Sequence, residues 1–420
     1  MAAANGGGSK SSVVRGMLVG AVLLLGAAPA ATADGPGVGT PTVVTLGDSA
    51  ISGEAGRWAG NTNGSSSRID ALGSTAYWDT PSGEAIKGCH RSKAAQAHIA
   101  GGVASANLAC SGAKTSTSGT GSGQAFKPGI DFYSDASGRK GQALALQTYA
   151  ASHNVRAVVV MIGANNYGFA AILERCVTNW LTSPSWFKNY CSDDASMVSR
   201  FTAARQAQET AAVRDALLRV RQAMTTAGYG ASQYKILAQT YWSPLPRGSG
   251  IRYPESGWTR QSIGGCGAWN RDLNWANDTV VPALNNSLRN GAANSGIPNI
   301  EVLDLQDSLV GRRLCETGVG LLEEVGVATW QSPGAVDRTE WVQQIRTTSH
   351  RSLPTPGGRP RELLGPAGDA QLPPARLQRW RRPRRPLHQG RQRARLARRA
   401  ADGVERLSAP AVSAGGSRAR

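Results

Sequence analysis

The feature that most constrains the fold is an alternation between short β-branched runs and longer segments of helix-forming residues. This alternation is typical of a parallel sheet that helices cover on both faces. The sequence therefore predicts the α/β class, as a three-layer sandwich with a central parallel sheet flanked by helices. Strands are expected over 42–46, 157–162, 235–240 and 300–305, with a fifth near 104–109.

Two long helices are expected between these strands. The first covers Met197 to Ala227, where Ala, Gln, Arg and Leu dominate and Asp194 and Ser196 offer caps. Gly228 follows directly and is expected to end it. The second helix is expected from Trp269 to Arg289.

The amino terminus has the pattern of a secretory signal peptide, predicted over 1–33. Lys10 and Arg15 precede an apolar run from Met17 to Ala28, and small residues follow up to Ala33. The run is about 12 residues long, short of the roughly 20 that cross a bilayer. We therefore expect a secreted protein without a transmembrane anchor.

Six cysteines follow this segment, an even number that suggests disulfides in an exported chain. Sequential pairing is the simplest of the fifteen possible connectivities. No Cys-x-x-Cys pair occurs, so no zinc site is predicted. The pairs would be Cys89 with Cys110, Cys176 with Cys191, and Cys266 with Cys315.

The net charge of +18 is concentrated at the carboxyl end. Residues 349–420 hold seventeen arginines and four acidic residues, a net charge of +13, so the first 348 residues carry only +5. We therefore expect one large domain over 34–348 and an Arg/Pro-rich, disordered tail over 349–420. Arginine clusters bind phosphates by charge alone, so the tail predicts non-specific polyanion binding but no specific nucleic-acid partner.

Three chemistry-bearing blocks occur in order, each just after a predicted strand. The first is Gly47-Asp48-Ser49, where a turn would expose the hydroxyl of a candidate nucleophile, Ser49. The second holds Gly112, whose N–H can approach an oxyanion because no side chain obstructs it. The third holds Asn165, whose amide can donate to the same oxyanion. Carboxyl ends of parallel strands share one edge, so the three blocks predict a single convergent site.

These blocks resemble those of the SGNH or GDSL hydrolase superfamily, in particular its secreted actinobacterial esterases and lipases. The likeness runs from about Pro41 to Thr348, although Ala50 stands where the name motif has leucine. It implies a flavodoxin-like SGNH hydrolase fold, an acyl-enzyme on Ser49, and an oxyanion held by the N–H groups of Ser49 and Gly112 and by the Asn165 amide.

The resemblance also implies a histidine near the carboxyl terminus, usually three residues after an aspartate, and this block is absent. Serine requires a base at neutral pH, so the absence decides whether the chain is active. No histidine of the chain has a carboxylate three residues before it. The five histidines are His90, His98, His153, His350 and His388.

Composition changes at the same place, which suggests a shifted reading frame. Beyond Ser349 there is no Lys, Asn, Ile, Phe, Tyr, Met or Cys, a bias that GC-rich coding produces when read out of frame. The bases can be regrouped so that each new codon takes the last two bases of one residue's codon and the first base of the next. In this shifted frame, the codons of Pro356 to Ala367 can encode Gln-Glu-Asp-x-His-x-Asn-Tyr-Trp-Gly-Gln. This hidden reading looks like the missing block, with Glu but not Asp permitted three residues before the histidine. The hypothesis is a frameshift between about Arg346 and Pro356.

The sequence thus predicts a secreted serine ester hydrolase that acts on lipid, aryl or acetyl-sugar esters, with no metal or cofactor. As written, the chain is expected to be impaired. Two alternatives remain open: a polyanion-binding secreted protein that uses the Arg-rich tail, and a catalytically inactive member of the family.

Overall fold

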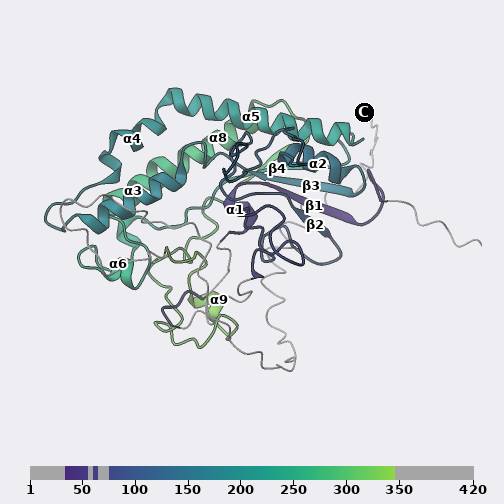
Figure 1. The fold of residues 1–420 in the computed structure, drawn as a ribbon. Helices are drawn as coiled ribbons and strands as arrows, with labels where there is room; N and C mark the ends of the chain where they lie inside the picture. The colour runs from purple at the N-terminus through teal and green to yellow at the C-terminus, as the bar shows by residue number, and fades with distance from the viewer. Residues whose placement is uncertain (1–33, 55–59, 65–74, 346–420) are drawn as a thin grey trace, which may run out of the picture.

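The computed structural model describes residues 34–54, 60–64 and 75–345 (Figure 1). Its centre is a parallel sheet of five strands in the order β2-β1-β3-β4-β5. All five predicted strands are present, and the predicted parallel sheet is confirmed. The strands are β1 (Pro41–Gly47), β2 (Ala104–Asn107), β3 (Asn154–Met161), β4 (Lys235–Gln239) and β5 (Ile300–Leu303).

The two central strands form the core because they are apolar on both faces. Val44 and Leu46 of β1 pair with Val158 and Val160 of β3, and all four side chains are fully buried. A parallel strand that is covered on both sides reads as a continuous apolar run, and β3 has that form. The edge strand β2 is only half-buried.

Helices flank the sheet, as predicted for this fold class. Figure 1 shows α5 and α8 along one face, and α2 packs against both α5 and β1. In Figure 1, α3 and α6 lie to the left of the sheet and α9 lies below it. The helices are α1 (Ser49–Ser52), α2 (Gln142–Ala150), α3 (Phe169–Thr182), α4 (Ala195–Val198), α5 (Ala203–Thr226), α6 (Thr259–Ser262), α7 (Asn270–Trp275), α8 (Val281–Ala293) and α9 (Ala335–Arg338).

The helix predicted from Met197 to Ala227 is interrupted, which corrects its first part. A 3₁₀ turn over 199–201 follows α4, and the backbone at Thr202 is extended. The Thr202 side chain accepts a hydrogen bond from the Arg205 N–H and so caps α5. Serine and threonine compete with the helical backbone for such bonds, which explains the break. Asp194 does cap α4, as expected.

The helix predicted from Trp269 to Arg289 is present and longer than expected. Trp269 precedes α7, a π-helical turn over 276–280 joins α7 to α8, and the helical stretch ends at Ala293. Pro282 lies in the first turn of α8, where its missing N–H costs little.

Sequential disulfide pairing is confirmed, and no free cysteine remains among the described residues. The bridge from Cys89 to Cys110 lies just after β2, and the one from Cys176 to Cys191 closes the excursion after α3. Each bridge therefore fixes an irregular segment that has few backbone hydrogen bonds of its own.

Two predicted regions lie outside the described residues: the signal peptide over 1–33 and the tail over 349–420. Among the residues that are described, no helix is both long and apolar enough to cross a membrane.

Adjacent leucines of α5 test how much of the stability comes from the packed face. Leu217 is fully buried, whereas Leu218 is 36% exposed. We expect Leu217→Ala to lower the free energy of unfolding by about 2–5 kcal/mol, since it leaves a cavity. Leu218→Ala, the matched control, is expected to cost less than about 1 kcal/mol. Urea unfolding of both variants measures this, and equal losses would contradict the assigned packing of α5.

Candidate active site

The three predicted site residues lie at the carboxyl edge of three adjacent strands. Ser49 follows β1, Gly112 follows β2, and Asn165 follows β3. The strand order is that of flavodoxin-like sheets, in which the chain turns to opposite sides of β1 and ligands bind in the crevice beside β1 and β3. Ser49 and Asn165 therefore flank the switch point of this sheet.

The turn after β1 depends on Gly47. Its φ is +139°, and a Cβ at this position would overlap the Met161 carbonyl oxygen, so only glycine fits. The buried Gln142 side chain clamps the same peptide: its Oε1 accepts from the Gly47 N–H at 2.7 Å, and its Nε2 donates to the Gly47 carbonyl at 2.9 Å. These contacts fix the direction in which the chain enters α1.

Ser49 is the first residue of α1, and its hydroxyl is half-buried. Its carbonyl accepts bonds from the Ser52 hydroxyl at 2.9 Å and from the Glu54 N–H at 3.1 Å. Across the described ranges, nothing hydrogen-bonds the Ser49 hydroxyl itself. The backbone of this residue is held while its Oγ stays available.

The second and third blocks are in direct contact. The Cys110 N–H donates to the Gly47 carbonyl at 3.0 Å, which holds the loop after β2 beside the turn after β1. Gly112 follows with φ of +78°, a conformation that favours glycine. The Asn165 amide donates to the Ala113 carbonyl at 2.9 Å, and its second N–H has no acceptor in the part of the chain that the structure describes.

The neighbouring amide, Asn166, has a structural role instead. Its Nδ2 lies 2.8 Å from the Thr115 hydroxyl and 2.7 Å from Glu209 Oε2, and its Oδ1 accepts from the Thr115 N–H. Its donors and its acceptor are all occupied. Of the two adjacent asparagines, Asn165 is therefore the one with capacity to bind a ligand.

Asp48 is buried directly beneath Ser49 and belongs to a network that reaches β4. Its Oδ2 accepts a 2.5 Å bond from the Tyr241 hydroxyl, which in turn accepts from the Ala164 N–H at 3.0 Å. Its Oδ1 accepts from the Ala50 N–H. Burial raises the pKa of Asp48 from 3.8 to about 7, although the Tyr241 bond opposes this shift.

The raised pKa of Asp48 predicts how stability depends on pH. The folded state binds a proton that the unfolded state releases, so the stabilisation is complete below pH 4 and is lost as the pH rises through about 7. We expect up to about 4 kcal/mol of unfolding free energy to be lost over this range.

Asp48→Asn imitates the protonated carboxyl and should flatten this decline, as measured by urea unfolding at pH 4.5 and 7.5. Asp304→Asn, whose carboxylate is exposed and paired with Arg289, is the matched control and should keep the decline. Identical profiles for Asp48→Asn and the parent would show that Asp48 does not titrate in this range.

The described histidines do not hydrogen-bond to Ser49 within those residues. His153 directly precedes β3 and His98 lies before β2, so both belong to the amino-end side of their strands, away from Ser49. His90 is at the carboxyl edge, where its Nδ1 lies 2.5 Å from Glu54 Oε1. The remaining two histidines, His350 and His388, are outside the described residues.

An apolar cavity of about 80 Å³ lies between α3, α7 and the segment after β4. Phe169 and Ile172 of α3 line it, together with Ser243, Leu273 and Val281. Ser49, Gly112 and Asn165 do not line this cavity, so it is separate from the three blocks.

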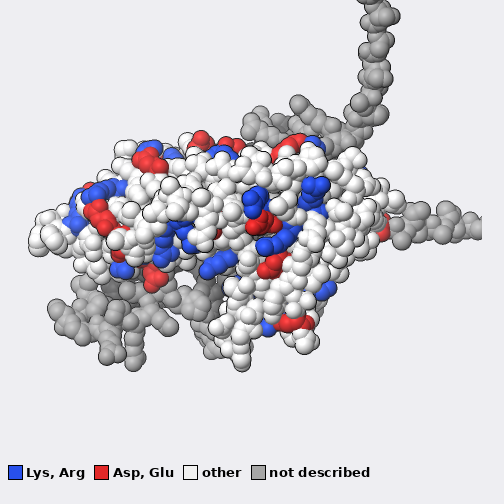
Figure 2. Space-filling model, turned by 90° about the horizontal axis from the view of Figure 1, so that it is seen from above, with Lys and Arg blue, Asp and Glu red and all other residues white. Residues whose placement is uncertain are grey.

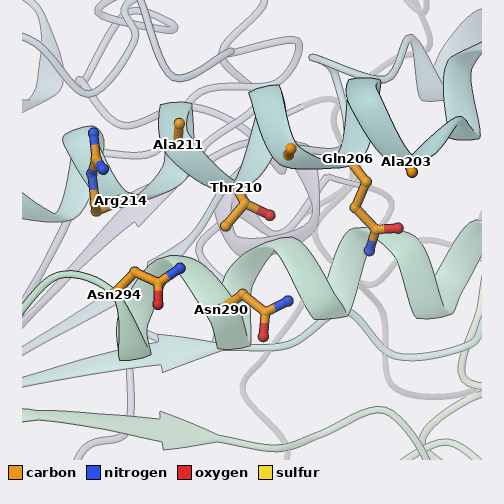
Figure 3. A pocket seen from close by; sticks show the side chains of 8 residues that line it. Ala203, Gln206, Thr210, Ala211, Arg214, Asn290 and Asn294 are labelled. Carbon is orange, nitrogen blue, oxygen red and sulfur yellow. The ribbon is translucent and has the colours of Figure 1, made fainter.

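A second hollow, of about 470 Å³, is an open groove between α5 and α8 (Figure 3). Gln206, Thr210 and Arg214 come from α5, and Asn290 and Asn294 face them from α8. The one charged group, Arg214, is paired with the adjacent Asp215. The groove brings together neither a nucleophile with a base nor any cluster of carboxylates.

The surface charge of the described domain is mixed. On the face that Figure 2 shows, basic and acidic side chains are interspersed, and no large area carries one sign. The domain itself thus lacks a basic patch on that face.

Among the described side chains, one group of three has ligand atoms close enough together to hold a metal ion: Cys176, Cys191 and Asp272. Both cysteines are joined in a disulfide, so neither offers a thiolate. Asp272 instead accepts the N–H groups of Cys191 and Ser192. These residues do not fit a metal.

Sequence reasoning did not identify three supporting residues: Gln142, Tyr241 and Glu54. Gln142 and Tyr241 act on the first block from 95 and 193 residues away. No local pattern marks a buried glutamine in a helix or a tyrosine after a strand as partners of a distant turn. No sequence pattern marks Glu54 as a partner of the serine block either.

No protein-family model and no curated protein sequence matches the chain. Solved structures do resemble it. An extracellular lipase from Streptomyces rimosus is 18% identical with a TM-score of 0.34, covering 73% of this chain and 94% of its own. A phospholipase A1 from Streptomyces albidoflavus is 18% identical with a TM-score of 0.34, covering 66% and 84%. An aryl esterase from M. smegmatis is 13% identical with a TM-score of 0.25, covering 66% and 89%.

All three TM-scores are below 0.5, so the fold class stands on the strand order of the chain itself. That order, with a serine, a glycine and an asparagine at adjacent strand ends, defines an α/β protein with its candidate site at the switch point of a flavodoxin-like sheet.

Proposed function

We propose that the chain is a secreted serine ester hydrolase of the SGNH or GDSL type. The observation that carries this proposal is the meeting of three turns at one edge of the sheet. The turn with Ser49 bonds to the loop with Gly112 through Cys110, and that loop bonds to Asn165 through Ala113. A free hydroxyl beside N–H donors is the minimum that acyl transfer requires.

In the proposed reaction, the Ser49 oxygen attacks the ester carbonyl carbon while its proton passes to a base. The carbonyl oxygen becomes an oxyanion, which the N–H groups of Ser49 and Gly112 and the free N–H of Asn165 stabilise. Collapse releases the alcohol, which takes up the proton and leaves an acyl group on Ser49. Water then attacks the acyl-enzyme in the same way and restores the hydroxyl.

The substrate class that we propose is that of lipid, aryl or acetyl-sugar esters. The apolar cavity of about 80 Å³ does not select among them, because Ser49, Gly112 and Asn165 do not line it.

The base is the missing component of this proposal. His98 and His153 lie toward the other edge of the sheet, and the His90 ring nitrogen that faces Glu54 is already engaged. We therefore propose that the chain as written has low activity. The alternative of polyanion binding by the Arg-rich tail stays a prediction, because the tail is outside the described residues.

Covalent labelling of the chain with its hidden carboxyl-terminal frame restored tests the nucleophile, because the serine needs its base in order to react. A fluorophosphonate reagent phosphonylates an activated serine, and peptide mass spectrometry identifies the modified residue. The proposal expects the adduct on Ser49. Labelling spread over several serines, or labelling that is unchanged in Ser49→Ala, would refute it.

A further inference from the structure

Glu54 connects the helix that begins with Ser49 to the loop that carries Gly112. Its N–H donates to the Ser49 carbonyl at 3.1 Å, so its backbone is attached to the first residue of α1. Gly53, with φ of +83°, ends α1 and turns the chain between the two residues. The Glu54 carboxylate then accepts a 2.5 Å bond from the hydroxyl of Ser111, the residue before Gly112.

The loop around Gly112 has few other attachments. On one side the Cys89–Cys110 disulfide and the bond from the Ser111 N–H to the Cys89 carbonyl hold it. On the other side Asn165 bonds to the Ala113 carbonyl. Two of the loop's bonds run to the segment bearing the nucleophile: the Cys110 N–H donates to the Gly47 carbonyl before Ser49, and the Ser111 hydroxyl donates to Glu54 after it. Of the two, only the Glu54 bond is made by side chains.

The Glu54 carboxylate is charged and is itself held in place. Its other oxygen, Oε1, pairs with His90 Nδ1 at 2.5 Å, and the His90 ring stacks on Tyr77 at 4.7 Å. Burial would raise the pKa of Glu54, but the bonds from His90 and Ser111 lower it overall, and the same pair raises the pKa of His90. Two further charges face the pair: Lys127, which attracts Glu54, and Glu84, which attracts His90.

The backbone at His90 is strained in the conformation in which its ring pairs with Glu54. His90 has φ of +50°, in the left-handed region that non-glycine residues seldom adopt. Glu84 stabilises that turn by accepting the N–H groups of Gly88 and His90 at 2.7 Å each. Strain of this kind persists only where the surroundings over-determine it, and it gathers at functional sites.

We propose that Glu54 is a positioning residue, whose carboxylate sets the separation between the Ser49 hydroxyl and the Gly112 N–H. The inference rests on the proposed function, because it concerns the oxyanion donor of that reaction. A displacement of about 1 Å in such a group can cost up to about a hundred-fold in rate. We expect Glu54→Gln, which keeps the size but loses one acceptor and the charge, to lower kcat by about ten-fold with KM nearly unchanged.

The experiment combines two readouts on the full-length chain. The first is amide hydrogen exchange of the peptide that spans 110–113, in which the N–H groups of Ser111 and Ala113 are hydrogen-bonded. The second is kcat and KM for p-nitrophenyl acetate, measured on the chain with its hidden carboxyl-terminal frame restored, because the chain as written is expected to have low activity. Glu301→Gln is the matched control, since the Glu301 carboxylate is exposed and pairs with Lys235 on the neighbouring strand.

We expect exchange of this peptide to speed up at least ten-fold in Glu54→Gln and to stay within two-fold in Glu301→Gln. If Glu54 acts through Ser111, then Ser111→Ala should show the same loss of kcat, and the double variant should lose no more. Unchanged exchange in Glu54→Gln, or losses that simply add in the double variant, would overturn the inference.

The outcomes also separate this inference from the proposed function. If Ser49→Ala hydrolyses the ester as fast as its parent when both carry the restored carboxyl-terminal frame, the proposed function fails, whatever exchange shows. If Ser49→Ala loses the activity while Glu54→Gln keeps both kcat and slow exchange, only the positioning role fails.

Discussion

Returning the carboxyl-terminal segment to its hidden reading frame is expected to raise p-nitrophenyl acetate hydrolysis by about a thousand-fold or more. The described residues bring a nucleophile and oxyanion donors to one edge of the sheet, but no histidine among them hydrogen-bonds to Ser49. Loss of one triad member typically lowers kcat by about 10⁴-fold to 10⁶-fold. The oxyanion hole and substrate binding still provide some residual catalysis. Supplying a base should recover most of that loss.

The measurement compares kcat/KM of the chain as written with a chain whose frame is shifted between Arg346 and Pro356. The matched control is the shifted chain with its hidden histidine codon changed to one for alanine, so that length and composition stay constant. Equal rates for the written and shifted chains would show that the base lies elsewhere. Equal rates for the shifted chain and its alanine control would show that the recovery has another cause.

Ser49→Ala in the frame-restored chain is expected to lower kcat by about 10⁴-fold or more, which leaves only the residual catalysis of the oxyanion hole and substrate binding. Without the hydroxyl no acyl-enzyme can form, and the base has nothing to activate. The substitution removes the hydroxyl of a half-buried residue. Within the described residues that hydroxyl makes no hydrogen bond, so the free energy of unfolding should hardly change.

Ser308→Ala is a suitable comparison, because Ser308 is an exposed serine in the turn region that follows β5 at the same edge. It should keep full activity and the fluorophosphonate adduct, whereas Ser49→Ala should lose both. Retention of more than a tenth of the rate by Ser49→Ala would refute the assignment of the nucleophile.

Much of the fold could be predicted because its signals are local. Runs such as 157–162 and 235–240 are rich in apolar and β-branched residues, so period and composition place the ends of both strands within three residues. The blocks with Ser49, Gly112 and Asn165 were predicted to share an edge because parallel strands put their carboxyl ends together, and the strand order bears out that placement.

The errors have local physical causes as well. The helix predicted from Met197 is broken at Thr202, because a threonine side chain there satisfies the N–H of Arg205 as well as a helical carbonyl would. Helix propensities do not account for this competition between the side chain and the backbone. The π-helical turn over 276–280 likewise depends on packing and not on composition.

The sequence by itself determined the α/β class, the five strands and the three blocks after the strands, because period and turn chemistry act over a few residues. It offered sequential disulfide pairing only as the simplest of fifteen connectivities, and the tertiary structure decided that pairing. Only the tertiary structure decided which side chains support those blocks. Gln142 clamps Gly47, Tyr241 binds Asp48, and Glu54 joins Ser49 to the Gly112 loop through Ser111. Such contacts form when folding removes water and leaves each buried polar group to find a partner, and that partner can come from any distance along the chain.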